Sequence, residues 1–103
     1  MIRYEVTLKI EKNIRKSFET WLEPHVQEML TFDGFIKATI HKEISEDNDI
    51  SILIVNYKVS SIDNLKYYFN NNADKMRQDG LSKFPKGFTA TRRIFDGDIE
   101  INL

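Results

Sequence analysis

The strongest constraint on the fold is a strict alternation at the start of the chain. Every second residue from Ile2 to Ile10 is apolar, and the residues between them are polar. A period of two is typical of a β-strand that buries one face and exposes the other. Further along, apolar residues recur at helical spacing over positions 14–30 and again over 62–76. The chain therefore predicts the order strand, helix, strand, strand, helix, strand.

Proline and glycine set the expected ends of the helices. Pro24 predicts a kink or break near Glu23, because a proline in mid-helix removes a hydrogen bond and clashes with the preceding turn. Gly80, after an aspartate, predicts the end of the second helix. In the second strand, alternation places Phe35 on the same face as Lys37. The later strands are expected over 35–44, 50–59 and 88–95.

Composition narrows the class of protein. With 103 residues and a hydrophobic fraction of 41%, residues 1–103 are expected to form a single domain with one core. A formal net charge of −1 argues against nucleic acid as the main partner. The chain has no cysteine, which excludes disulfides and suits a reducing cytoplasm. No apolar run is long enough for a signal peptide or a membrane span. We therefore expect a cytoplasmic protein with no membrane partner.

The third strand indicates that both faces of the sheet are covered. Ile50, Ile52 and Ile54 lie on one face of this strand, and Leu53 and Val55 lie on the other. A strand that is apolar on both faces is normally buried on both. Two helices cover only one face of a four-stranded sheet, and the simplest cover for the other is a second copy of the same sheet. The sequence therefore predicts a homodimer that forms through its sheet faces.

The order of elements is that of the ferredoxin-like fold, an α+β βαββαβ arrangement with a four-stranded antiparallel sheet and two helices on one face. With both sheet faces covered, the chain resembles a dimeric α+β barrel, in which two such sheets pack face to face. Several segments also resemble a family of short bacterial domains of unknown function. These segments are residues 2–7, Trp21, 24–26, 29–30, Tyr57, Ala73, 76–77 and 84–92. The resemblance covers nearly the whole chain and implies a bacterial protein of this fold, but it implies no activity.

Candidate ligand-binding residues fall on the helix side of the predicted sheet. His25 follows Trp21 by four residues, so the two share one helix face. The histidine is either a base or hydrogen-bond donor at the rim of a cleft, or it is satisfied by a backbone carbonyl that Pro24 leaves free. Tyr57 has an apolar body and a polar tip suited to lining a cavity or the core. Arg92 and the arginine after it point to opposite faces, so one points inward and is able to receive a carboxylate or phosphate.

A second set of candidates lies on the polar sheet face. Glu5 and His41 are expected there, together with the basic residues of the first strand. Such a cluster either supports acid–base chemistry or forms a salt-bridge network that fixes the register of the dimer. An arginine of the last strand is expected to pair with Glu5. Tyr4 is expected in the core, and Tyr67 and Tyr68 are expected on the surface of the second helix.

Three functions remain compatible with the sequence. The first is binding of a small molecule in the cleft between sheet and helices, near Trp21, His25, Tyr57 and Arg92. The second is a structural or protein-interaction module. The third, supported by fold analogy alone, is a cofactor-independent oxygenase or isomerase with a histidine base. The chain has no glycine-rich phosphate loop and no histidine pair at metal spacing, so neither a cofactor nor a metal site is expected.

Overall fold

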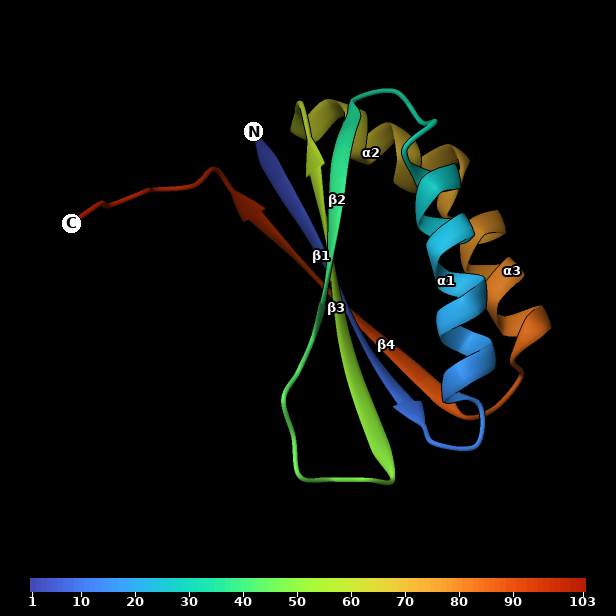
Figure 1. Ribbon diagram of the computed structural model, residues 1–103. Coiled ribbons are helices and arrows are strands. Elements are labelled where there is room, and N and C mark those ends of the chain that lie inside the picture. Colours follow the sequence, from blue (N-terminus) through green and yellow to red (C-terminus); the bar gives the residue numbers. More distant parts are fainter.

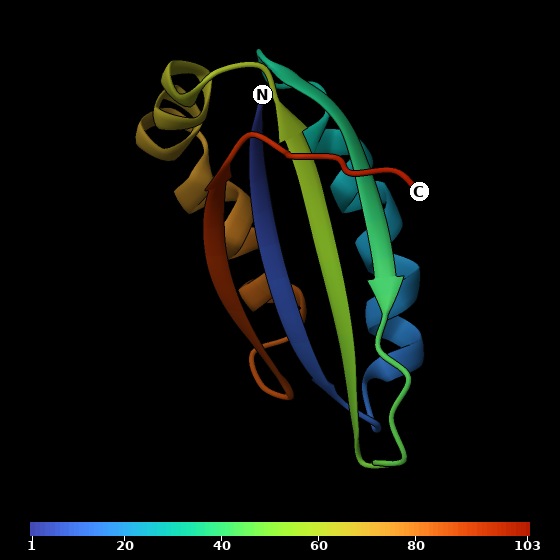
Figure 2. The ribbon, with the colours of Figure 1, turned by 90° about the vertical axis from the view of Figure 1, so that its left-hand side faces the viewer.

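The computed structural model describes residues 1–103 and has the ferredoxin-like α+β fold (Figure 1). The sheet has the order β2-β3-β1-β4, and all neighbouring strands are antiparallel. The helices cover one face of the sheet, and Figure 2 shows the opposite face without any cover from the chain's helices. The elements are β1 (Ile2–Glu11), α1 (Arg15–Met29), β2 (Phe35–Lys42), β3 (Ile50–Val59), α2 (Ile62–Asn71), α3 (Ala73–Lys83) and β4 (Phe88–Asp96). None of the helices combines the length and the apolar composition needed to cross a bilayer.

The alternation in β1 has the predicted effect on side-chain direction. Tyr4 and Leu8 are buried beneath the helices, and the odd-numbered residues point to the other side. We call that other side the open face. It consists of the odd-numbered residues of β1 and β4, those of β2 from Lys37 onward, and the even-numbered residues of β3. Ile52 and Ile54 lie on this face, so β3 is apolar on both sides as predicted.

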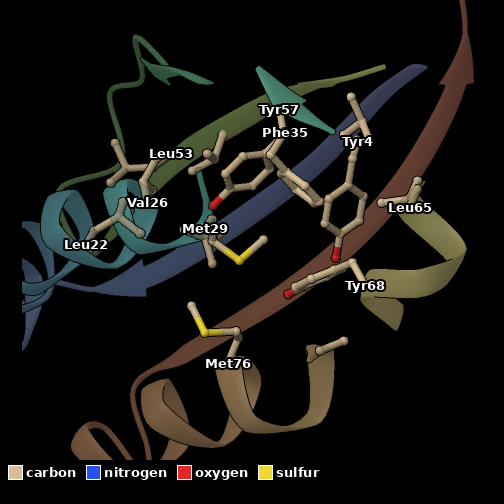
Figure 3. Packing of buried hydrophobic residues seen from close by; sticks show 14 of the residues in the cluster. Tyr4, Leu22, Val26, Met29, Phe35, Leu53, Tyr57, Leu65, Tyr68 and Met76 are labelled. Carbon is tan, nitrogen blue, oxygen red and sulfur yellow. The ribbon is translucent and has the colours of Figure 1, made fainter. Parts of the chain in front are cut away.

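Aromatic side chains form much of the core between the sheet and the helices (Figure 3). Phe18 of α1 is fully buried, with its ring centroid 5.1 Å from that of Phe84 and 4.9 Å from that of Phe88. At the other end of the core, the rings of Tyr4 and Tyr57 stack with their centroids 5.8 Å apart. The helices are thus held against the sheet by burial of large apolar surfaces.

The expected break at Pro24 is wrong, because α1 runs without interruption through this residue. Pro24 faces solvent, where water can satisfy the carbonyl that loses its helical partner. The opposite side of the helix buries Phe18, Leu22, Val26 and Met29. Burial of each such side chain contributes about 1.5–3 kcal/mol, and the four together outweigh a proline cost of about 3 kcal/mol.

The second predicted helix is two helices, so three helices cover the sheet instead of two. The break lies at Asn72, which has φ −130° and ψ −25°. Asparagine favours such breaks because its amide competes for backbone groups, as Asn71 does by donating to the carbonyl of Tyr67 at 2.8 Å. The predicted stop at Gly80 is also wrong, because α3 continues to Lys83.

Phe35, the first residue of β2, faces the core. The alternation in the sequence predicted the opposite, that it would lie on the open face. A bulge at Ile36 shifts the register, so that Phe35 lies opposite Val59 whereas Lys37 lies opposite Lys58. One extra residue in a strand interrupts the alternation, so the residues before and after the bulge point to opposite faces of the sheet. Phe35 is therefore buried among the core aromatics.

Candidate functional site

The four predicted ligand-binding residues line one cleft between the sheet and the helices. Trp21 and His25 reach it from α1, Tyr57 from β3 and Arg92 from β4. Most of the other lining residues are apolar, and no carboxylate is among them. The cleft has a cavity of about 60 Å³. The fold thus brings together residues that are up to 71 positions apart in the chain.

Three tyrosines give the cleft its polar interior. Tyr4, Tyr57 and Tyr68 are buried residues that line it, and none of the side-chain hydrogen bonds of the chain involves their hydroxyls. Figure 3 shows these hydroxyls directed into the region where the sulfur atoms of Met29 and Met76 also lie. Burial raises the pKa of both Tyr57 and Tyr68 well above the usual value, and the neighbouring tyrosines raise it further. Their hydroxyls are therefore neutral and free to bond to a ligand.

The position of Tyr68 corrects its predicted place on the surface of the helix. This side chain is only 3% exposed, and its ring centroid lies 5.2 Å from that of Phe35. Tyr68 follows the buried Leu65 by three residues, so the two share the helix face that meets the sheet. Tyr67 is exposed as predicted.

Two arginines give the cleft a positive charge. Arg92 faces the helices, and Arg77 of α3 lines the same cleft. Neither guanidinium forms a salt bridge, and the Nε atom of Arg77 is buried without a hydrogen-bond partner. The charge of Arg92 partly offsets the rise in the pKa of both Tyr57 and Tyr68. The cleft is therefore apolar with unpaired positive charge, a combination suited to an organic anion.

His25 lies at the edge of the cleft. Its imidazole stacks on the indole of Trp21 with the ring centroids 4.4 Å apart and the planes 24° from parallel. Burial lowers the pKa of His25, and the charges of Glu28 and Asp79 oppose this only in part. The imidazole is therefore neutral at pH 7. None of the side-chain hydrogen bonds of the chain involves His25, unlike the arrangement considered as the alternative above.

Within one protomer, Glu5 and His41 lie apart on the sheet face. Both lie on the open face, but β3 separates their strands, and His41 stands opposite Ile54. The Glu5 side chain is 6% exposed and accepts a hydrogen bond from Arg93 Nη2 at 2.7 Å, as the predicted pairing requires. Arg3 adds a longer contact of 3.4 Å to the same carboxylate.

Two cleft residues, Tyr68 and Arg77, were missed at the level of sequence. Tyr68 follows a buried leucine by three residues, and Arg77 follows the buried Ala73 by four. Helical spacing from these buried residues was the signal that could have placed both on the inner face. This signal was overlooked because Tyr68 was predicted to lie on the surface and because α2 and α3 were predicted to be one helix.

A comparison with protein families shows where the chain belongs. The fold and the cleft define a ferredoxin-like α+β domain with a cleft between its sheet and helices. The family described as a domain of unknown function, DUF4286, matches residues 1–97. The chain belongs to this family, which confirms the predicted resemblance to a family of domains of unknown function. No curated protein matches the chain.

Solved structures with the same fold share little sequence with the chain. A dimeric ferredoxin-like protein from an uncultured marine organism is 13% identical, with a TM-score of 0.71 and all of both chains covered. SnoaB from Streptomyces nogalater, a cofactor-independent oxygenase, is 13% identical with a TM-score of 0.68, covering 97% of this chain and 96% of its own. The heme-degrader MhuD from Mycobacterium tuberculosis is 10% identical with a TM-score of 0.69, covering 99% of this chain and 100% of its own. At this level of identity the likeness concerns the fold alone.

Proposed function

We propose that the cleft binds a small organic acid with an apolar body, such as an aromatic carboxylate. The observation that carries this proposal is the unpaired charge of Arg77 and Arg92 in a cleft that contains no carboxylate. Arg92 is exposed to water, but the Nε atom of Arg77 is buried without a partner, and a buried charged group is normally paired with an opposite charge. In this chain no side chain supplies that charge, so we assign it to the ligand.

The contacts available to such a ligand follow from the positions of the lining residues. The carboxylate meets the guanidinium of Arg92, whose two parallel N–H groups suit both of its oxygens. The hydroxyls of Tyr57 and Tyr68, which line the same cleft, add further donors. The apolar body packs against the buried side chains of α1 and β3. A hydrogen bond to a charged group contributes about 1.5–3 kcal/mol, enough to select an acid over its amide.

The size of the cavity limits the ligand. A cavity of about 60 Å³ is smaller than the roughly 150 Å³ that holds benzene in an apolar protein core. Trp21 and His25 are half-buried and border the cleft, so their movement would enlarge it. The heme-degrader binds two hemes in its active site, but this cleft has no room for a group of that size. We therefore restrict the proposal to ligands of about one aromatic ring.

Thermal unfolding with matched pairs of compounds tests the proposal. Benzoate, phenylacetate and 4-hydroxybenzoate should each raise the melting temperature, since a ligand that binds only the native state stabilises it. The corresponding amides should have little effect. Arg92→Gln should remove the effect of the acids, and Arg93→Gln on the open face is the matched control that should keep it. Equal shifts for acids and amides, or an unchanged response in Arg92→Gln, would contradict the proposal.

The neutral His25 favours catalysis as a second candidate function. In this reaction the imidazole takes a proton from an acidic C–H or O–H of the bound molecule, and the electron pair stays on the substrate as an anion that Arg92 stabilises. SnoaB, with the same fold, is a cofactor-independent oxygenase. Hydrogen–deuterium exchange at the carbon next to the carboxylate of phenylacetate measures this proton transfer directly, because O–H protons exchange with water without a catalyst. His25→Gln should stop this exchange while the acid still raises the melting temperature. An interaction module without a ligand site predicts neither effect.

We also propose that the chain forms a homodimer through the open face. Ile52 and Ile54 lie at the centre of this face, and the ring of Phe95 lies on it beside Arg3 and Arg93. A second copy would remove this apolar surface from water. Sedimentation should show a dimer for the native protein, and Ile54→Lys should give a folded monomer. A native monomer at high concentration would contradict this proposal without affecting the one for the cleft.

A further inference from the structure

The last seven residues, 97–103, leave the sheet as an extended segment that we call the arm. Its backbone is tied to the sheet at Gly97, whose N–H donates to the carbonyl of Met1 at 2.8 Å. Beyond that bond the arm has no helix or strand partner. Figure 1 shows it projecting away from the sheet on the side opposite the helices, and Figure 2 shows it passing in front of the open face.

The arm has the sequence pattern of a strand with one apolar side. Ile99, Ile101 and Leu103 alternate with Asp98 and Glu100. The two isoleucines are 93% and 88% exposed, and the leucine is fully exposed. A regular row of exposed aliphatic side chains is costly in water and marks a surface that contacts another molecule.

The charge of the open face indicates what that other molecule is. Arg3, Lys58 and Lys37 stand opposite one another in one row across three strands, at the end of the sheet where the arm begins. Like charges in such positions repel each other. Neither lysine forms a salt bridge, and Asp98 lies at the same hollow without pairing. When two open faces meet, their rows of cations repel each other unless anions lie nearby. Asp98 and Glu100, on the acidic side of the arm, supply these anions.

The length and direction of the arm bring it to a second copy. Seven extended residues span about 23 Å, whereas two packed sheets lie about 10 Å apart. The arm leaves the sheet on the open side, so in a face-to-face dimer it must pass the partner protomer. Asp98 lines the hollow that contains the cations of its own sheet, and alternation places Glu100 on the same side of the arm.

We infer that the arm docks on a second copy of the chain, with Ile99 and Ile101 against the open face of the partner and with Glu100, on the opposite side of the arm, toward the basic row of its own sheet. This inference rests on the proposed homodimer. It adds that the dimer is held by the arm as well as by the sheet, and that ion pairs between arm and sheet make the association sensitive to salt.

Sedimentation of variants of the 103-residue chain tests the inference. The double variant Ile99→Ser/Ile101→Ser should raise the dimer dissociation constant at least about tenfold, because both side chains lose an apolar contact. Glu100→Gln should weaken the dimer at low salt and reduce its salt dependence. Leu81→Ser, an exposed aliphatic residue on the helix side, is the matched control and should have no effect. All of these side chains are exposed in the protomer, so circular dichroism should show unchanged folding.

The outcomes separate the arm from the homodimer. If the native chain is a dimer and the arm variants bind as tightly as it does, the arm inference is overturned and the sheet interface stands. If the native chain is a monomer at high concentration, both fall together. If Leu81→Ser weakens the dimer as much as the arm variants do, contact through the helix side replaces the arm.

Discussion

Replacing Gly80 with alanine tests whether the wall of the cleft can move. Gly80 lies inside α3 against the indole of Trp21. Alanine is more favourable than glycine in a helix interior by about 1 kcal/mol. The added Cβ would lie 3.1 Å from Trp21 Cη2, so the ring would have to shift by a few tenths of an ångström. The net effect on the free energy of unfolding is the difference between these two contributions.

The surroundings of Trp21 decide which contribution is larger. The indole is half-buried and borders the cavity, so it has space to move into. The next contacts of the new Cβ, at 3.7 Å, are ordinary van der Waals distances. We therefore expect Gly80→Ala to stabilise the protein by up to about 1 kcal/mol, equivalent to a few degrees in melting temperature. The displaced indole should at the same time narrow the cleft and weaken binding of the acids.

Urea denaturation of a double-mutant cycle measures the two contributions separately. In a Trp21→Leu background nothing opposes the new Cβ, so Gly80→Ala should give its full gain of about 1 kcal/mol. The gain in the native background should be smaller by the cost of moving the indole. Destabilisation by more than about 1 kcal/mol in the native background would refute the reasoning. It would mean that Trp21 is locked in place and that the cleft cannot open for a ligand.

Two further predictions concern ionisable groups. Glu5→Gln should lower the free energy of unfolding by about 1–2 kcal/mol, because Arg93 loses its buried charged acceptor but stays exposed enough to bind water instead. Urea denaturation at low salt measures this change. An unchanged free energy of unfolding would show that the Glu5–Arg93 pair contributes nothing to stability. Burial lowers the pKa of His25 in the folded chain below its unfolded value of 6.5. As the pH falls below about 6.5, the unfolded chain therefore binds a proton at His25 more readily than the folded chain does. The free energy of unfolding should therefore decrease below about pH 6.5, and His25→Gln should make this decrease smaller. His41→Gln, at an exposed position, is the control. A decrease in His25→Gln as large as in the native protein would contradict the claim that His25 causes it.

The sheet could be predicted from sequence because its evidence is local. Alternation in β1 and the doubly apolar β3 depend only on neighbouring residues, and both lie as predicted. Pro24 and Gly80 misled because their intrinsic preferences were outweighed by packing. Pro24 stays in α1 because the inner side of the helix is buried, and Gly80 stays in α3 because Trp21 lies against it.

The site could be predicted only in part, for a related reason. Trp21 and His25 share a helix face, which spacing alone reveals. Arg92 and Arg77 line the same cleft because of how β4 and α3 pack, and no local sequence pattern contains that information. Phe35 shows the same limit, since one bulged residue at Ile36 reversed its predicted face.

The most direct test of the central claim is a titration of the labelled protein with 4-hydroxybenzoate, followed by amide NMR shifts. The account predicts saturable shifts at amides of α1, α3 and β4 around the cleft, including those of His25 and Arg92. The same titration of Arg92→Gln should give none of these shifts, and 4-hydroxybenzamide should give none with the native protein. Unchanged spectra with this acid, benzoate and phenylacetate at millimolar concentration, or shifts confined to the open face, would contradict the claim that the cleft binds organic acids.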